Sequence, residues 1–185
     1  MKQMIQQAFL QLLSSAPMHE IAVKNITDQA NIHRSTFYVY YSNKEALYQA
    51  IIEDTLFDLE KAIQPASNLT FEAIQKLYEE SSCILNEALF FLQHIESNEL
   101  AYRVLLSDIQ FQKQFAQVIQ QSIMLGNILP TIQAKHLSYG AIGLIQEWLQ
   151  NKAHYTIQEL ALYLTRSNIH ALIDYSHTVN QQQKR

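Results

Sequence analysis

The chain has 185 residues, 48% of them hydrophobic and 10% aromatic, so it can hold one large domain or a small domain beside a larger one. Only three glycines and three prolines occur, which argues against a β-rich fold, and the net charge of −4 argues against attraction of nucleic acid by overall charge. The single cysteine, Cys83, excludes an internal disulfide. No run approaches the roughly 18 apolar residues of a membrane-spanning helix, so we expect a cytoplasmic protein with no membrane partner.

Apolar residues recur at helical spacing in the first part of the chain, and no strand pattern is found. A first helix is predicted over residues 2–15, before Pro17, and two short helices over 23–30 and 34–41. Asn31 lies at the turn between the short helices, where it tolerates a left-handed backbone. Ser42 and Glu45 have the spacing of a capping box, which predicts a fourth helix running to about Ile63.

The rest of the sequence predicts a helical body, in which caps and breakers mark the ends of the helices. The predicted helices run over 70–94, from a Ser97 cap to Leu106, from an Asp108 cap to near Gly126, from Pro130 to Asn151, and from a Thr156–Glu159 capping box to about His177. The expected fold is therefore all-α, with about nine helices. It divides into a helix-turn-helix head at residues 1–48 and a helical bundle at residues 49–185, with the fourth helix as a rigid connection.

The two short helices have the layout of a helix-turn-helix that reads DNA with its second helix. Its expected small core consists of Ile21, Ile26, Ala30, Ile32 and Phe37. Tyr41 lies four residues after Phe37 and should share its buried face. The head holds four basic and three acidic residues and the body nine and fourteen, so the head alone suits contact with phosphate.

The exposed side chains of the second helix are the predicted DNA contacts. Arg34, Ser35 and Thr36 occupy its first turn, where base edges are read, and arginine on guanine is the commonest specific contact. Tyr38 and Tyr40 offer hydroxyls to phosphate oxygens. The remaining predicted contacts are His33, which caps the helix or touches phosphate, Lys44, which clamps phosphate, and Lys24. The alternative is that the aromatic residues here are only the core of a small bundle.

This segment resembles the TetR/AcrR family of bacterial transcriptional regulators. The matching positions are Ile21, Val23, Ile26, Ala30, Ile32, Thr36, Phe37, Tyr38, Lys44, Glu45 and Leu47. The departures are Ala22, Thr27, Asn31, His33, Tyr40 and Tyr41, of which Ala22 loses a helix cap. The resemblance covers about the first quarter of the chain. Residues 140–164 are more loosely similar to the regulators of dihydroxyacetone kinase operons, some of which are activators or act with protein partners.

The resemblance implies a homodimer formed through the helices at about 130–151 and 156–177, and a small-molecule effector pocket in the body. Gly140 and Gly143 would let the dimer helices approach closely. Pocket candidates are polar or aromatic residues on otherwise apolar helices, although each such residue is more often packed or at the surface. They are Tyr78, Cys83, Phe90, His94, Tyr102, Arg103, Glu147 and Trp148.

The predicted function is a TetR-like repressor that binds a palindromic operator as a homodimer and responds to an effector in its body. The alternatives are an activator, or a protein-interaction module of the same fold with no small-molecule effector. An enzyme is not expected, because no nucleophile elbow, phosphate-binding glycine loop or zinc motif occurs. No cofactor and no metal site is expected either, because the histidines of the body are not at metal-ligand spacing.

Overall fold

The structure is a computed structural model that describes residues 1–63, 76, 86–123, 131–152 and 154–182. The helices in these ranges are α1 (Lys2–Leu13), the short 3₁₀ helix η1 (Met18–Glu20), α2 (Val23–Gln29), α3 (Arg34–Tyr40), α4 (Lys44–Ile63), α6 (Asn86–Ser97), α7 (Glu99–Leu105), α8 (Ile109–Ile123), α9 (Thr131–Gln150) and α10 (Ile157–Gln182). The described part of the chain contains no strand and nine α-helices, so the all-α prediction is confirmed. No helix of the described ranges is long and apolar enough to cross a membrane.

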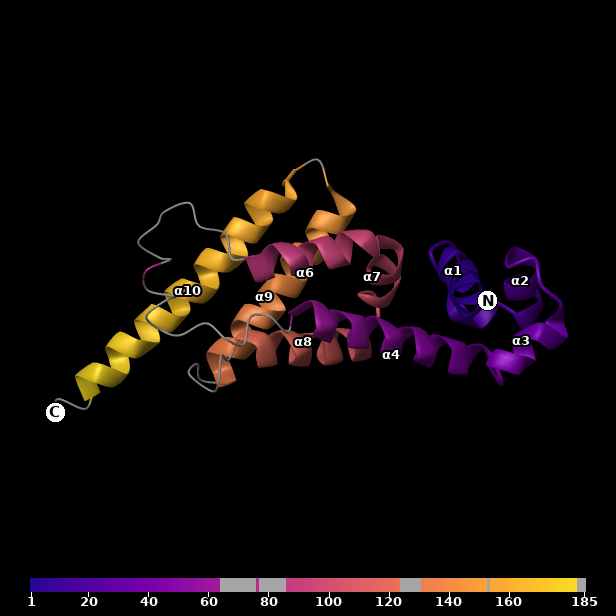
Figure 1. The fold of residues 1–185 in the computed structure, drawn as a ribbon, viewed down its shortest axis with the longest axis horizontal. Coiled ribbons are helices and arrows are strands. Elements are labelled where there is room, and N and C mark those ends of the chain that lie inside the picture. The colour runs from indigo at the N-terminus through magenta and orange to yellow at the C-terminus, as the bar shows by residue number, and fades with distance from the viewer. Residues whose placement is uncertain (64–75, 77–85, 124–130, 153, 183–185) are drawn as a thin grey trace.

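The helices form two groups joined by α4 (Figure 1). One group, which we call the head, consists of α1, α2 and α3 and lies at one end of the molecule. The other group, the body, consists of α6 to α10, and α4 extends from the head along it. The predicted division at residues 48 and 49 falls within α4, which runs uninterrupted through both positions.

The head closes around a core of fully buried side chains. Ile5 and Phe9 of α1 are 0% exposed and pack with Ile26 and Phe37 of the short helices. Leu47 of α4 is also fully buried, so the first turns of the connecting helix belong to the same core. The predicted head core is confirmed, with Ile32 partly rather than fully buried.

The start of α4 differs from the prediction by one residue. Its cap is Asn43, whose Oδ1 accepts a hydrogen bond of 2.7 Å from the backbone N–H of Ala46. The predicted capping box of Ser42 and Glu45 is therefore wrong. Both Ser and Asn are strong caps, and the sequence alone does not decide between two of them in succession.

The body is held together by an aromatic core. Tyr102 of α7 lies 5.6 Å from Phe115 and 6.3 Å from Phe111 of α8, measured between ring centroids. Phe91 of α6 stacks on Phe115 at 6.1 Å. Trp148 of α9 is only 2% exposed and joins the same cluster. These rings pack α6, α7, α8 and α9 into one unit.

The helix boundaries of the body are partly as predicted. Asp108 caps α8 as expected, since its Oδ1 accepts from the N–H of Gln110 at 2.8 Å. Ser97 does not cap a helix, because α6 continues through it and α7 starts after Asn98. The last part of the predicted helix at 70–94 overlaps α6, and most of its earlier part lies outside the described residues. The predicted helix boundaries at Gly126 and Pro130 also lie outside the described residues.

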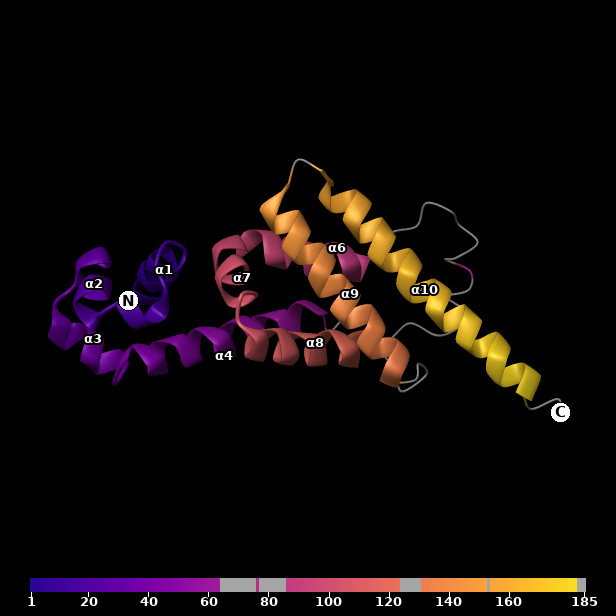
Figure 2. The same cartoon turned by 180° about the vertical axis from the view of Figure 1, so that it is seen from behind.

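The last two helices run beside each other (Figure 2). The capping box that opens α10 is confirmed: Thr156 Oγ1 accepts from the N–H of Glu159, and Glu159 Oε2 accepts from the N–H of Thr156. The Glu159 carboxylate accepts from both the N–H and the hydroxyl of Thr156, and these two bonds lower the pKa of its carboxyl group. The helix continues to Gln182, beyond the predicted end at His177.

Candidate nucleic-acid interface

The turn between α2 and α3 is closed by the backbone itself. Asn31 has a φ of 50°, the left-handed conformation predicted for it. The N–H of Ile32 donates to the carbonyl of Thr27 at 3.0 Å, and the N–H of Asn31 donates to the carbonyl of Asp28 at 3.1 Å. These two bonds form a Schellman motif, which satisfies the last carbonyls of α2 and fixes the direction in which α3 leaves.

The first turn of α2 has half of a capping box. Ala22 precedes the helix and offers no side-chain cap, as the sequence predicted. Asn25 compensates in part, because its Oδ1 accepts a hydrogen bond of 2.8 Å from the N–H of Ala22. Lys24 lies between them on the first turn with its side chain exposed. The turn is therefore ordered from within, and Lys24 is left at the surface.

One side of α3 is buried and the other faces outward. Phe37 is 0% exposed and Tyr41 5% exposed, and their ring centroids are 5.9 Å apart. Burial raises the pKa of the Tyr41 hydroxyl, which has no hydrogen-bond partner among the described residues. Tyr38 and Tyr40 are exposed instead. This confirms that the three tyrosines do not share one face of the helix.

Arg34 and Tyr38 form a pair on the outward side of α3. The Arg34 Nη2 donates to the Tyr38 hydroxyl at 3.1 Å, and its guanidinium carbon lies 5.6 Å from the centre of the tyrosine ring. The tyrosine ring itself leans edge-on against Phe37, with ring centroids 5.4 Å apart. Buried Phe37 therefore supports Tyr38, and Tyr38 in turn contacts the Arg34 guanidinium.

The other predicted contacts of this helix lie around that pair. His33 precedes α3 and its side chain makes no capping bond, so the predicted capping alternative for His33 is wrong. Ser35 is exposed and Thr36 is partly buried. Val39, with 78% of its side chain exposed, was missed by the sequence reasoning, because a valine at this spacing looks like a core residue.

Lys44 occupies a different position from the one predicted for a phosphate clamp. Its Nζ donates to the carbonyls of Met18 and Ile21, both at 2.8 Å. These carbonyls belong to the segment that leads into α2. Two of the three N–H groups of the ammonium are therefore directed into the head. In this structure Lys44 ties the start of α4 to the entrance of the helix-turn-helix.

The predicted effector residues are scattered, except for one pair. His94 and Tyr102 lie edge-on with ring centroids 5.8 Å apart, and His94 Nε2 and the Tyr102 hydroxyl are both buried with no hydrogen-bond partner among the described residues. Burial lowers the pKa of His94, while the Asp58 carboxylate acts in the opposite direction. Burial also raises the pKa of Tyr102, and Asp58 adds to that effect.

The remaining candidates do not join this pair. Phe90 is 51% exposed, Glu147 bonds to Asn151 at the surface, and Trp148 is buried beneath Lys152. Arg103 lies in a separate cleft, described below. Tyr78 and Cys83 lie outside the described residues. Within the described ranges, no group of three or more metal-binding side chains comes together.

Residues 5–51 match the model of the bacterial regulatory proteins of the tetR family. This range covers most of α1, both helices of the helix-turn-helix and the first turns of α4. In this range the chain is similar to the tetR family. The resemblance described above is therefore confirmed for the N-terminal part of the chain, which includes the aromatic segment.

Comparison beyond the head gives two further findings. The chain is 28% identical over 129 residues to the activator of the dhaKLM operon, DhaS, of Lactococcus lactis, which corresponds to 69% of this chain and 60% of the length of that relative. A solved structure of a dihydroxyacetone kinase operon activator DhaS aligns over 94% of both chains, with a TM-score of 0.56 and 20% identity. A tetR-family regulator structure from Syntrophomonas wolfei has a TM-score of 0.65 and 13% identity over 93% of this chain and 94% of that one. At these identities the solved structures show the fold.

Proposed function

We propose that this tetR-family chain is a transcriptional regulator that binds operator DNA through α3. The observation that carries the proposal is the outward face of α3, where Arg34, Ser35 and Tyr38 stand on a helix fixed by a Schellman turn and a buried phenylalanine. A helix held in this way presents its first turn to base edges in the major groove. Val39 adds an apolar group suited to a thymine methyl.

The direct contacts have separate proposed roles. Arg34 reads guanine with its guanidinium fork, and Ser35 and Thr36 accompany it at the first turn. Lys24, His33, Tyr38 and Tyr40 contact phosphate or sugar oxygens and fix the register. Lys44 acts by holding α4 against the segment before α2, since its ammonium is directed to two carbonyls there.

We also propose that the regulator is a homodimer formed through the exposed sides of α9 and α10, within the predicted ranges 130–151 and 156–177. Ile132, Tyr139 and Tyr163 are 77%, 46% and 59% exposed, which is unusual for large apolar side chains on neighbouring helices. A Cβ atom placed on Gly140 or Gly143 would meet nothing within 4 Å. Packing within one chain therefore does not require these glycines, and a partner helix can approach there. A dimer would present two α3 helices to a palindromic operator.

An effector that acts on the body is the third part of the proposal. His94 and Tyr102 supply its polar anchors, because buried polar atoms without partners are rare in folded proteins and a bound molecule can satisfy them. The family relationship is compatible with repression and with activation. The relative from Lactococcus lactis is named as an activator, and this favours activation as the second candidate outcome.

Selection from a library of random DNA duplexes tests the DNA-binding proposal. We expect an enriched inverted repeat whose half-sites lie one helical turn or a small multiple apart. Arg34→Ala should lose about 10- to 100-fold in discrimination at one base position of each half-site, because it removes a specific base contact. Lys113→Ala on α8 is the control and should preserve the selected sequence. Absence of any enriched sequence for the wild-type protein would overturn the proposal.

A further inference from the structure

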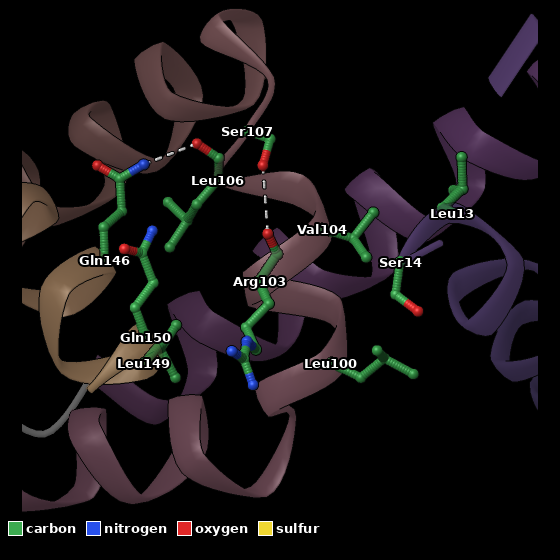
Figure 3. Close-up of a pocket in the computed structure, with 10 residues that line it drawn as sticks. All are labelled: Leu13, Ser14, Leu100, Arg103, Val104, Leu106, Ser107, Gln146, Leu149 and Gln150. Carbon is green, nitrogen blue, oxygen red and sulfur yellow. Dashed lines mark hydrogen bonds between the residues drawn. The ribbon is translucent and has the colours of Figure 1, made fainter. Parts of the chain in front are cut away.

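A cleft of about 590 Å³ lies where the head meets the body (Figure 3). Its walls are the end of α1, the helix α7 with the corner that follows it, and the last turns of α9. Leucines and a valine form the apolar part of the lining, while Ser14, Ser107, Gln146 and Gln150 bring polar groups. This volume is within the range of about 300–1,000 Å³ that small-molecule sites occupy.

We propose that this cleft binds a small organic anion. Of the described residues that line it, Arg103 alone is charged, and no carboxylate is among them. Figure 3 shows the Arg103 side chain extending between Leu100 and the side chains of Leu149 and Gln150. A guanidinium next to apolar walls and neutral hydrogen-bonding groups suits a carboxylate or phosphate carried on a short organic body.

Arg103 is paired with Glu99, and this ion pair leaves the Arg103 guanidinium available to bind an anion. Arg103 Nη1 lies 3.2 Å from Glu99 Oε1, in a surface ion pair. The other oxygen of Glu99 lies 2.8 Å from Lys152 Nζ, and this bond is the main reason that the pKa of Glu99 is lowered. Lys152 also lies 3.5 Å from Glu96. Glu99 is thus shared between two cations, and an exposed ion pair of this kind contributes little to stability.

The corner between α7 and α8, which lines the cleft, is bonded to three other helices. The carbonyl of Leu106 accepts from Gln112 Nε2 of α8 at 2.7 Å and from Gln146 Nε2 of α9 at 2.9 Å. Two residues later, Asp108 Oδ2 accepts from the Tyr48 hydroxyl of α4 at 3.1 Å. A ligand that displaces this corner therefore acts on α4, α8 and α9 together.

The opposite wall of the cleft belongs to the head. Leu13 and Ser14 end α1, and α1 packs on α2, the first helix of the helix-turn-helix. Phe9 of α1 also lies edge-on to Tyr48 of α4, with ring centroids 6.5 Å apart. A bound anion would contact both the head and the body, and it would therefore stabilise the relative position of the two that fits it best. Occupation of the cleft therefore alters operator affinity, a consequence that rests on the proposed function.

The binding test needs no DNA. Equilibrium dialysis of the full chain would compare probes with matched apolar parts: benzoate with benzyl alcohol, hexanoate with 1-hexanol, and phenyl phosphate with phenol. We expect the anion of at least one pair to bind about tenfold more tightly than its neutral partner, because it gains a charge-assisted pair with Arg103. Arg103→Gln should remove this preference, Arg103→Lys should keep part of it, and Lys113→Gln should leave it unchanged.

Three outcomes would overturn the site: no binding of any probe at millimolar concentration, equal binding of anion and neutral partner, or an anion preference that survives in Arg103→Gln. Circular dichroism confirms that each variant is folded. The bound anion is then added to the protein on its selected operator. A changed affinity in the wild type and an unchanged one in Arg103→Gln support the regulatory role, and an unchanged wild-type affinity overturns it. Failure of the proposed function is distinct, since it appears as absent operator binding before any anion is added.

Discussion

The head and the body treat their polar groups differently. In the head, Asn25, Asn43 and Lys44 use their side chains on nearby backbone groups, and the helix-turn-helix is held by bonds of 2.7–2.8 Å. In the body, His94 Nε2 and the Tyr102 hydroxyl are buried without a described partner. The Tyr41 hydroxyl of the head is likewise buried without a described partner, so the contrast lies in the polar side chains that bond the helices of the head to its backbone.

The largest effect is expected from removing the central side chain of the head. Phe37→Ala should lower the free energy of unfolding by about 3–5 kcal/mol, because Phe37 is fully buried beneath both Tyr38 and Tyr41. Urea unfolding followed by circular dichroism measures the change. The matched control is Phe57→Ala, whose ring is 58% exposed and should contribute little. Similar losses for the two variants would contradict the assignment of Phe37 to the core.

Substitution of Lys44 tests whether this residue positions α4 or contacts phosphate. Lys44→Met should lower the free energy of unfolding by about 2 kcal/mol, since it removes two hydrogen bonds from a charged donor. It should weaken operator binding while leaving the salt dependence of that binding unchanged. Lys24→Met, at an exposed position, should show the converse: unchanged stability and a salt slope smaller by about 1. A reduced salt slope for Lys44→Met would restore its role as a phosphate contact.

The polar atoms in the body core are tested by removing one of them. Tyr102→Phe should raise the free energy of unfolding by about 1 kcal/mol in the absence of effector, because the tyrosine hydroxyl is buried without a described partner. The matched control is Tyr48→Phe, which loses a hydrogen bond to Asp108 and should be destabilised by about 1 kcal/mol. Thermal unfolding in parallel gives both values. Destabilisation by Tyr102→Phe would mean that its hydroxyl has a partner.

The smallest effect is expected from Asn31→Gly, at the turn between α2 and α3. Asn31→Gly should stabilise the protein by a few tenths of a kcal/mol, and Asn31→Ala should destabilise it by about 1 kcal/mol, because the backbone there is left-handed. Chemical denaturation of the two variants side by side measures the difference. Equal stability of the glycine and alanine variants would argue against this turn geometry.

Much of the head could be predicted from residues that are close in sequence. Helical spacing, the breaker Pro17 and the tolerance of Asn31 for a left-handed backbone depend on local chemistry, and each matches the structure within one or two residues. The errors occurred where local signals are equivalent. Asn43 rather than Ser42 caps α4, and α6 continues through Ser97, since neither position differs from a neighbour in local preference.

The candidate site was less predictable where a side chain has distant partners. Lys44 bonds to carbonyls 23 and 26 residues earlier, which no local pattern indicates. His94 and Tyr102 were predicted separately, and only the packing of α6 against α7 brings their rings together. Val39 was not among the predicted contacts, and only the structure shows that this apolar side chain is exposed.

The sequence by itself determined the all-α class, the helix-turn-helix and the similarity to the tetR family, because these depend on periodicity, caps and a motif contained within residues 5–51. Only the tertiary structure decided which polar groups are used within the fold and which face a cavity. Arg103 lines a cleft with Ser14 of the head because α1 packs against α7, almost 90 residues further along the chain. Contacts at such separation follow from how the helices pack, and helical periodicity specifies a buried face without specifying its partner.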